Sequence, residues 1–272
     1  MRIIWCGPWR WRAEAKPCGR EGVSFSPNRM QYLEDLVMNI HDAKVLITGG
    51  TAGIGYDTAK LLMERGAKVA ICGRDADRLA RAQEALPGVV ALQGDVGSAE
   101  DARRMVGETI EALGGYNALV NNAGYGKFGP MVAQDPEVMA SIFRTNVIGT
   151  MLMARESVPY FIEQGYGNVL NVGSTAGDKG FAGGTAYAAS KAAVKSMSES
   201  WREELRTSNI RVMLIKPSEV VTEFAAAAGF PQQDSPKKLH GIDIAYAILH
   251  ALEQPDVGFI PEFPVWATNP KG

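Results

Sequence analysis

From Lys44 onward, hydrophobic and polar residues alternate between two patterns, one typical of buried strands and one typical of amphipathic helices. Short runs that are apolar on both faces are separated by longer segments with apolar residues on one helical face. The short runs predict six strands: KVLIT, AKVAICG, VVALQGDV, NALVNNAG, GNVLNVGS and IRVMLIKPS. The longer segments predict helices: IGYDTAKLLMERG, DADRLARAQEAL, AEDARRMVGETIEAL, a long helical region around 135–164 and the helix that contains Tyr187. GFIPEF, near the C-terminus, is a candidate seventh strand.

This succession of elements predicts an α/β fold. Strands that are buried on both faces belong in a parallel sheet covered by helices. The sequence has no repeat at solenoid spacing, and no linker rich in Pro, Gly or Ser divides it. We therefore expect one doubly wound parallel sheet of the Rossmann type in a single domain.

Residues 1–37 break this pattern. They include three of the five tryptophans and mix Arg, Pro and Gly without a helical or strand period. Gly7, Pro8 and Arg10 interrupt the apolar stretch that a signal peptide would need, and the composition is not that of a transit peptide. We expect a disordered extension or an artefact of the start site, with Met30 as an alternative start and the domain over 38–272.

Composition and charge restrict the class of partner. The 272 residues are 46% hydrophobic and 21% charged, with a formal net charge of -2, which is typical of a soluble globular protein with no field that favours nucleic acid or an anionic membrane. Three cysteines without paired spacing fit the reducing cytoplasm, and three scattered histidines predict no metal site. The expected partner is a small molecule.

The segment TGGTAGIG lies between the first predicted strand and the first predicted helix. Its glycines Gly49, Gly53 and Gly55 would let the backbone approach a pyrophosphate, whose charge the N–H groups of the helix N-terminus would face. A plain tight turn is the alternative. Three residues and then one separate these glycines, whereas the common dinucleotide fingerprint has one and then two.

Further motifs follow this loop in a fixed order. They are GDV with Asp95, NNAG from Asn121 to Gly124, TNV with Asn146, NVGS with Ser174, and YAASK from Tyr187 to Lys191. With these motifs the sequence resembles the short-chain dehydrogenase/reductase family, in its compact single-domain branch with the pattern Thr-Gly-x-x-x-Gly-x-Gly. The resemblance runs from Lys44 to about Thr222. Any one motif could arise by chance, but the whole ordered set could not.

Tyr187 and Lys191 stand four residues apart, so they share one face of a helix. At neutral pH roughly one free tyrosine in a thousand is a phenolate. A neighbouring ammonium, together with an oxidised nicotinamide ring, would lower the tyrosine pKa toward working pH. The resemblance implies that Tyr187 exchanges a proton with the substrate oxygen during hydride transfer, and that Lys191 also holds the nicotinamide ribose. A solvated surface pair is the alternative.

Other polar residues receive roles from the same resemblance. Ser174 ends a strand and would hold the substrate carbonyl. Asn146 would anchor a water molecule in the proton path from Lys191; a helix-interior side chain bonded to backbone is the alternative. Asp95 would bind the adenine, and Asn121 would tie neighbouring strands together as well as touch the cofactor.

The remaining predicted cofactor contacts lie along the same edge of the sheet. They are Thr51, Ile54, Val96, Asn122, Ala123, Gly124, Pro217, Val220 and Thr222. One motif departs from the family: after the sixth strand Ser218 stands where Pro-Gly would place the glycine, which leaves the geometry of that loop open. The tract that follows, near 223–240, is where the family keeps its substrate lid.

The end of the second strand, AICGRD, bears on the cofactor. Gly73 stands where family members that use NAD commonly carry aspartate, and Arg74 follows where users of NADP bind the 2′-phosphate. Ala52 lacks the second basic residue of strongly specific members, and Asp75 could partly neutralise Arg74. We expect NADP(H) to be preferred, with NAD(H) as the second choice; a solvated Arg74 is the alternative.

The resemblance implies an NADP-linked carbonyl reductase or alcohol dehydrogenase that acts on a ketone or secondary alcohol, with a 3-oxoacyl thioester as one specific candidate. A catalytically inactive regulatory protein that binds nucleotide is the rival hypothesis, and intact Ser174, Tyr187 and Lys191 count against it. A sugar-nucleotide epimerase or dehydratase would have a different glycine spacing. Family members usually form homodimers or homotetramers, here through the helix near 140–164 and the Tyr187 helix.

Overall fold

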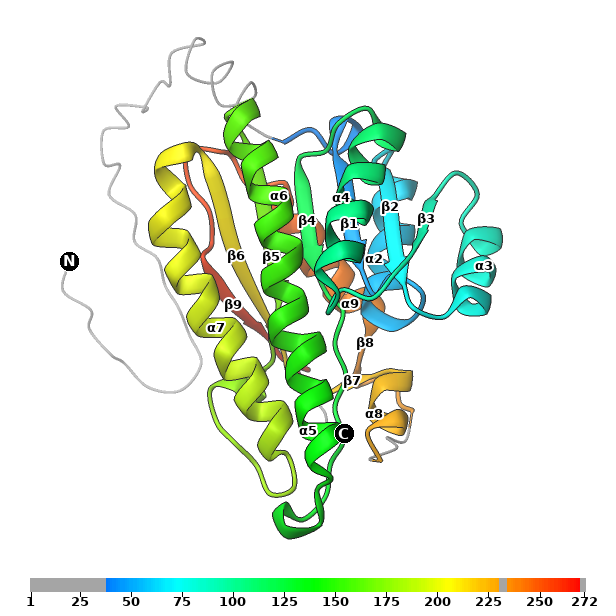
Figure 1. Ribbon diagram of the computed structural model, residues 1–272, viewed down its shortest axis with the longest axis vertical. Helices are drawn as coiled ribbons and strands as arrows, with labels where there is room; N and C mark the ends of the chain where they lie inside the picture. The colour runs from blue at the N-terminus through cyan, green and yellow to red at the C-terminus, as the bar shows by residue number, and fades with distance from the viewer. Residues whose placement is uncertain (1–37, 230–233, 270–272) are drawn as a thin grey trace, which may run out of the picture. The chain divides into compact units, whose positions relative to one another are not determined.

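The computed structural model describes residues 38–229 and 234–269. Its centre is an all-parallel sheet of seven strands in the order β3-β2-β1-β4-β5-β6-β9 (Figure 1). These strands are β1 (Lys44–Thr48), β2 (Lys68–Gly73), β3 (Val90–Gln93), β4 (Ala118–Asn121), β5 (Gly167–Val172), β6 (Ile210–Pro217) and β9 (Glu262–Val265). A separate short pair joins β7 (Val220–Val221) to β8 (Leu239–His240). The predicted single doubly wound domain is confirmed for these residues.

Helices cover both faces of the sheet. They are α2 (Gly53–Glu64), α3 (Ala76–Ala85), α4 (Ala99–Leu113), α5 (Pro136–Phe143), α6 (Thr150–Gln164), α7 (Thr185–Leu205), α8 (Glu223–Ala227) and α9 (Gly241–Leu252). Figure 1 shows α4, α6 and α7 in front of the sheet, with α2 and α9 behind it. No helix in the described part of the chain is long and apolar enough to cross a membrane.

Alternation along the strands produces two cores. In β1, Val45 and Ile47 pack with α2, α3 and α9, whereas Leu46, between them, packs with α4 and α6. All three side chains are fully buried. Since successive side chains of a strand point to opposite faces, a strand with a core on each side must be apolar throughout. That requirement explains the continuous apolar runs in the sequence.

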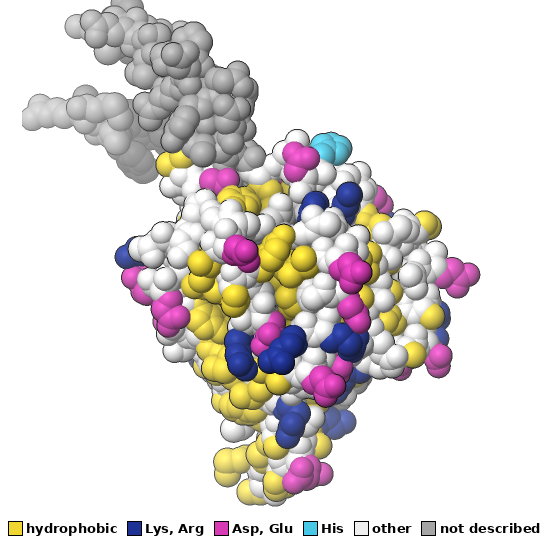
Figure 2. Space-filling model, turned by 45° about the horizontal axis from the view of Figure 1, so that its top comes forward, with side chains coloured by type: hydrophobic (Ala, Val, Ile, Leu, Met, Phe, Trp, Pro, Cys, Tyr) yellow, Lys and Arg dark blue, Asp and Glu magenta, His cyan; other side chains and the backbone are white. Residues whose placement is uncertain are grey.

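The face that α4, α6 and α7 cover retains hydrophobic side chains at the surface. Figure 2 shows them gathered among basic and acidic side chains. The exposed large apolar residues of α5, α6 and the turn between them are Phe143, Ile148, Met151 and Ile162. Exposed apolar side chains that gather on one face are typical of a contact surface.

Two elements differ in detail from the prediction. The seventh strand exists, but it begins at Glu262, because a turn in which the Gly258 N–H donates to the Pro255 carbonyl (3.1 Å) occupies the start of the predicted run. The long helical region 135–164 is divided by a π-helical turn, Arg144–Gly149, between α5 and α6. A π turn adds one residue to a helical ring, and apolar periodicity does not indicate it. The prediction for residues 1–37 lies outside the described residues, and the domain boundary at 38 stays a prediction.

Candidate active site

The loop after β1 takes a shape that requires glycine. Gly49 and Gly53 have φ angles of 65° and 54°, which side-chain-bearing residues rarely adopt. A Cβ on Gly55 would lie 2.4 Å from the Gly49 carbonyl oxygen and 2.5 Å from Asn122 Nδ2. Ala52 is the N-cap of α2, and no side chain caps this helix. The first N–H groups of α2 are therefore available to an anion, and the loop fits the pyrophosphate of a dinucleotide.

The glycine loop is tied to the end of β4 by side chains from both strands. Thr48 Oγ1 accepts hydrogen bonds from the backbone N–H groups of Asn122 (3.0 Å) and Ala123 (2.9 Å). Asn122 Nδ2 donates to the carbonyls of Thr48 (2.9 Å) and Gly49 (3.0 Å). β1 and β4 are the neighbours at which the strand order reverses, where α/β folds bind their ligands. Sequence reasoning missed Thr48, although it opens the TGGTAGIG motif.

The end of β2 presents Arg74 to solvent. In the described part of the chain Arg74 forms no ion pair, and its carbonyl accepts from Gln93 Nε2 at 3.2 Å. The Asp75 carboxylate caps α3 by accepting from the Arg78 N–H at 3.0 Å, so it is engaged away from the Arg74 guanidinium. A Cβ on Gly73 would lie 2.9 Å from Thr51 Cγ2. Thr51 therefore fills the space that an aspartate at position 73 would need.

Three of the predicted catalytic side chains meet where β5 ends against α7. Ser174 follows β5, and its hydroxyl accepts from the Ala176 N–H at 3.1 Å and is hydrogen-bonded to Tyr187. Lys191 Nζ donates to the Val172 carbonyl at 2.8 Å and lies 5.8 Å from the centre of the Tyr187 ring. The helical spacing of four thus places the amine beside the ring, and the strand end brings Ser174 to the phenol.

Burial governs the titration of this pair. It raises the pKa of Tyr187 above its ordinary value, and the hydrogen bond with Ser174 offsets part of that rise. Burial also lowers the pKa of Lys191 to about 8. The sequence-based expectation that the Lys191 ammonium and an oxidised nicotinamide ring together lower the tyrosine pKa concerns the cofactor-bound protein and stays a prediction; in the protein by itself, burial raises the pKa of Tyr187. A bound cation or a polar ligand would therefore be needed to bring the pKa of Tyr187 below its value in the protein by itself.

Asn146 lies in the π-helical turn and joins the loop after β4 to α7. Its Oδ1 accepts from the Tyr125 N–H (2.9 Å), and its Nδ2 donates to the Tyr125 carbonyl (3.0 Å) and to Ser190 Oγ (2.9 Å). The side chain is therefore bonded to backbone, which agrees with the alternative hypothesis of a helix-interior side chain with a structural role. It fixes the loop after β4 against the helix of Tyr187, and Tyr125 and Ser190 are partners that sequence reasoning missed.

Two further predicted residues have structural partners. Asn121 Nδ2 donates to Asn171 Oδ1 at 3.0 Å, which confirms that Asn121 ties β4 to β5. Asp95 Oδ1 accepts from the Gly97 N–H at 2.9 Å and shapes the turn after β3. Val96, next to it, is buried against Gly149. The adenine contact of Asp95 stays a prediction.

The segment after β6 reaches back to the glycine loop. Ser218, which departs from the family pattern, donates its N–H to the Val265 carbonyl at 2.9 Å, so the loop is held by the neighbouring strand β9. Thr222 lies against Gly53, with 3.4 Å between the Thr222 methyl group and the position of a Cβ at Gly53. In the predicted lid, Glu223 of α8 pairs with Arg78 of α3 at 3.2 Å. This ion pair was not predicted.

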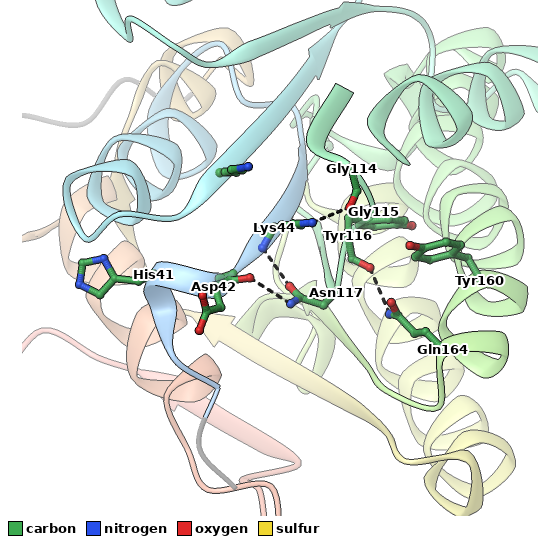
Figure 3. Close-up of a pocket in the computed structure, with 11 residues that line it drawn as sticks. His41, Asp42, Lys44, Gly114, Gly115, Tyr116, Asn117, Tyr160 and Gln164 are labelled. Carbon is green, nitrogen blue, oxygen red and sulfur yellow. Dashed lines mark hydrogen bonds between the residues drawn. The ribbon is translucent and has the colours of Figure 1, made fainter. Parts of the chain in front are cut away.

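A separate cavity of about 420 Å³ lies at the opposite edge of the sheet, by the amino ends of β1, β2 and β4. Figure 3 shows that its polar groups bond to one another. Lys44 Nζ donates to the Gly114 carbonyl at the end of α4, and Asn117 bridges the Lys44 N–H (2.9 Å) and the Asp42 carbonyl (3.3 Å). None of the predicted site residues lines this cavity. Its polar residues hold the strand ends together.

Comparison with known proteins agrees with this geometry. The family model described as short chain dehydrogenase matches residues 43–232. An uncharacterized oxidoreductase of Staphylococcus saprophyticus is 33% identical over 224 residues, covering 80% of this chain and 94% of the relative. The oxidoreductase asL5 of Sarocladium schorii is 32% identical over 223 residues, covering 79% of this chain and 90% of the relative.

Solved structures with the same fold include two serine dehydrogenases. The closed form of serine dehydrogenase complexed with NADP+ is 29% identical, with a TM-score of 0.75 over 81% of this chain and 93% of that chain. The serine dehydrogenase from Escherichia coli is 28% identical, with a TM-score of 0.72 over 81% of this chain and 96% of that chain. Together with the family match and the motifs, these likenesses establish that the chain belongs to the short-chain dehydrogenase/reductase family of oxidoreductases, which use nicotinamide cofactors.

Proposed function

We propose that this protein is an NADP(H)-preferring oxidoreductase that interconverts a ketone and a secondary alcohol, acting on the CH–OH group of the donor. One observation carries the proposal: the hydroxyls of Tyr187 and Ser174 and the amine of Lys191 meet at the carboxyl edge of the sheet. The glycine loop of α2 opens at the same edge. An acid–base pair beside a dinucleotide loop is the arrangement that hydride transfer to a carbonyl needs.

In the proposed reaction each side chain has one task. A bound nicotinamide would supply the hydride to the carbonyl carbon. Tyr187 gives its phenolic proton to the carbonyl oxygen, so that one hydride and one proton together convert the ketone into the alcohol. Ser174 donates a hydrogen bond to the same oxygen and spreads its developing charge. In the oxidative direction Tyr187 takes the proton back.

Lys191 and Asn146 support that proton transfer in the proposal. Lys191 holds the ribose hydroxyls with its amine, and Asn146 positions a water molecule that reloads Tyr187 from solvent. The predicted cofactor contacts complete the cleft, from Thr51, Ile54 and Asp95 at the nucleotide end to Pro217, Val220 and Thr222 at the nicotinamide end. The proposed setting is the cytoplasm, where a reduced buried thiol such as Cys72 persists.

The test of this function is a substrate screen. Ketones, secondary alcohols and 3-oxoacyl thioesters are offered with NADP(H) and with NAD(H), and the change in nicotinamide absorbance is followed. Turnover of at least one class is expected. The rival, a regulatory protein that binds nucleotide without turnover, predicts cofactor binding with no reaction across the panel.

The cofactor preference rests on Arg74. The Arg74→Ala variant is expected to lose about 1–3 kcal/mol of its selectivity for NADP(H), the size of one charge-assisted contact to the 2′-phosphate. The ratio of kcat/KM for NADPH and NADH measures it. Arg65→Ala removes the same charge from the exposed carboxyl end of α2 and serves as the control. A wild-type protein that uses NADH as well as NADPH would contradict the assignment. Gly73→Asp is a poorer test, because the new side chain would displace Thr51.

The affinity for NADPH is expected to depend on the protonation of Lys191. Since burial lowers the pKa of Lys191 to about 8, the amine is mostly protonated at pH 7 and loses its charge as the pH rises through 8. At pH 9 about one tenth of the ammonium remains, so the dissociation constant of NADPH should rise by up to about tenfold. Titration by protein fluorescence from pH 6.5 to 9.5 measures it. In Lys191→Met the dissociation constant of NADPH should be high at every pH and show no step near pH 8. If the variant shows the same step as the wild type, the titrating group is not Lys191.

We extend the proposal to assembly. A homodimer or homotetramer would cover the exposed Phe143, Ile148, Met151 and Ile162 with the matching surface of a second copy. The α6 and α7 helices that the family resemblance implicates lie together in front of the sheet (Figure 1).

A further inference from the structure

Two phenylalanines contact the ring of Tyr187, and a third packs on one of them. The centre of the Phe128 ring lies 5.6 Å from that of Tyr187, the Phe224 ring lies 5.4 Å from it, and Phe181 packs edge-on against Phe128 at 5.2 Å. Phe128 follows β4, Phe181 follows β5 and Phe224 belongs to α8. Two of these segments thus bring a ring into contact with the predicted proton donor, and the third packs its ring on Phe128. We call Phe128, Phe181 and Phe224 the phenylalanine cluster.

The backbone is built around these rings. A Cβ on Gly126 would lie 3.1 Å from Phe128 Cε1 and from Tyr187 Cδ2, and 3.2 Å from Phe224 Cζ. The Phe181 ring lies over Gly184, where a Cβ would come within 2.2 Å of it. Glycine at these two positions therefore lets the rings lie close to the backbone. A larger residue at Gly126 would push Phe128 and Phe224 away from Tyr187, and one at Gly184 would displace Phe181.

Backbone hydrogen bonds join the three segments that carry the rings. The Phe128 N–H donates to the Ala228 carbonyl just after α8 at 3.0 Å, and the Gly129 N–H donates to the Gly183 carbonyl at 2.9 Å. The cluster is therefore arranged before any substrate arrives. Its rings are not all enclosed, since the side chain of Phe181 is 44% exposed. Exposed aromatic surface held beside a reactive group is typical of a binding site for an apolar group.

Several charged groups on the same segments are engaged in ion pairs or line a neighbouring cavity. Asp178, three residues before Phe181, pairs with Lys195 at 2.9 Å and Lys216 at 2.6 Å. Glu223, next to Phe224, pairs with Arg78. Lys127 and Glu137 line a cavity of about 370 Å³ that adjoins Gly126. Among the described residues, the aromatic contacts of Tyr187 are with Phe128 and Phe224, and the amine of Lys191 is the charged group that lies against its ring.

We propose that the phenylalanine cluster takes up an aryl or bulky alkyl substituent of the substrate carbonyl, so that the substrate class is an apolar ketone and its alcohol. This inference rests on the proposed function and narrows it. A substrate of the serine type carries an ammonium and a carboxylate next to the reacting carbon, and the phenylalanine rings offer no hydrogen-bonding partner to either charge. Apolar substituents gain from leaving water at the same place.

The test compares two ketones that differ in one substituent. The kcat/KM for NADPH-dependent reduction is measured with acetophenone and with acetone, and that for NADP+-dependent oxidation with L-serine. The wild-type protein is expected to favour acetophenone over acetone by at least about 100-fold and to leave L-serine unchanged. Phe224→Ala and Phe181→Ala should each lower kcat/KM for acetophenone by about 10- to 100-fold and change that for acetone by less than about threefold.

A matched control removes an aromatic ring elsewhere. Tyr246 of α9 is 43% exposed, close to the 44% of Phe181, and stacks on His250 away from the cluster. Tyr246→Ala should leave both ketones unaffected. Melting temperature and NADPH binding verify that each variant is folded. Saturation-transfer NMR of acetophenone with Tyr187→Phe and with Tyr187→Phe/Phe181→Ala reports binding without chemistry, and the double variant should lose the signal.

The outcomes separate the two proposals. A wild-type preference for acetone or L-serine, or equal losses for both ketones in folded Phe181→Ala and Phe224→Ala, would overturn the apolar substrate while leaving a ketone or alcohol oxidoreductase standing. Turnover of no ketone, alcohol or thioester would overturn the proposed function. The NMR comparison then tests the cluster separately. If acetophenone binds equally to Tyr187→Phe and to Tyr187→Phe/Phe181→Ala, the binding role of the cluster is overturned as well.

Discussion

Replacement of Tyr187 by phenylalanine is expected to lower kcat by about 10²–10⁴-fold, the loss typical of a removed acid–base group. The phenol is the hydroxyl that meets Ser174 beneath the phenylalanine cluster, and the substitution removes its proton with little change in volume. The cofactor should still bind, because the glycine loop and Lys191 are untouched. Steady-state rates and NADPH titration on the same sample measure the two effects separately.

A second tyrosine provides the control for this variant. Tyr116 is also buried, but it lies at the amino end of β4, by the cavity on the opposite edge of the sheet (Figure 3). Tyr116→Phe deletes the same hydroxyl group and should keep wild-type kcat. Rates near those of the wild type in Tyr187→Phe would exclude the proposed mechanism. Equal losses in both variants would indicate a general effect of packing.

The second large effect is expected at Gly55. A methyl group there would lie 2.4 Å from the Gly49 carbonyl oxygen, which belongs to backbone and cannot turn away. Gly55→Ala should therefore open the loop, weaken NADPH binding by about 10- to 100-fold through lost hydrogen bonds to the pyrophosphate, and cost about 1–3 kcal/mol of the free energy of unfolding. Isothermal titration and urea unfolding measure these two quantities.

Gly107 offers the matching control within the same chain. It lies inside α4, and a Cβ there would meet nothing within 4 Å. Gly107→Ala should stabilise the protein by about 0.5–1 kcal/mol, because alanine is the better helix former, and leave NADPH binding unchanged. If Gly55→Ala behaves in the same way as Gly107→Ala, the glycine loop does not have the tight shape described here.

Much of the sheet could be predicted from the sequence because its physical signal is local. Strands between two helical layers must be apolar throughout, so each one appears as a run, and the glycine loop appears where β1 gives way to α2. The spacing of Tyr187 and Lys191 also predicted their shared helix face, which the 5.8 Å contact confirms. Features that depend on residues close together in the sequence could therefore be predicted.

What could not be predicted depends on partners far apart in the sequence. The pairing of Thr48 with Asn122 joins residues 74 positions apart, and that of Asn146 with Ser190 joins residues 44 apart. The pKa of Tyr187 depends on how deeply the site is buried, which no spacing reveals. The phenylalanine cluster has no sequence motif, since its members come from three unrelated loops and helices. These features arise only when the chain folds and brings distant residues together, so local sequence patterns do not indicate them.

The short helix α8 has a consequence for protein engineering. Its first residue, Glu223, pairs with Arg78 near the end of the second strand, where we propose that cofactor choice is decided, and its second, Phe224, touches Tyr187. Two adjacent residues of α8 thus contact α3 through Arg78 and α7 through Tyr187. A redesign that recruits Arg78 to a new nucleotide would release Glu223 and shift its neighbour. Libraries aimed at coenzyme exchange should therefore vary positions 78, 223 and 224 together and be screened on more than one ketone.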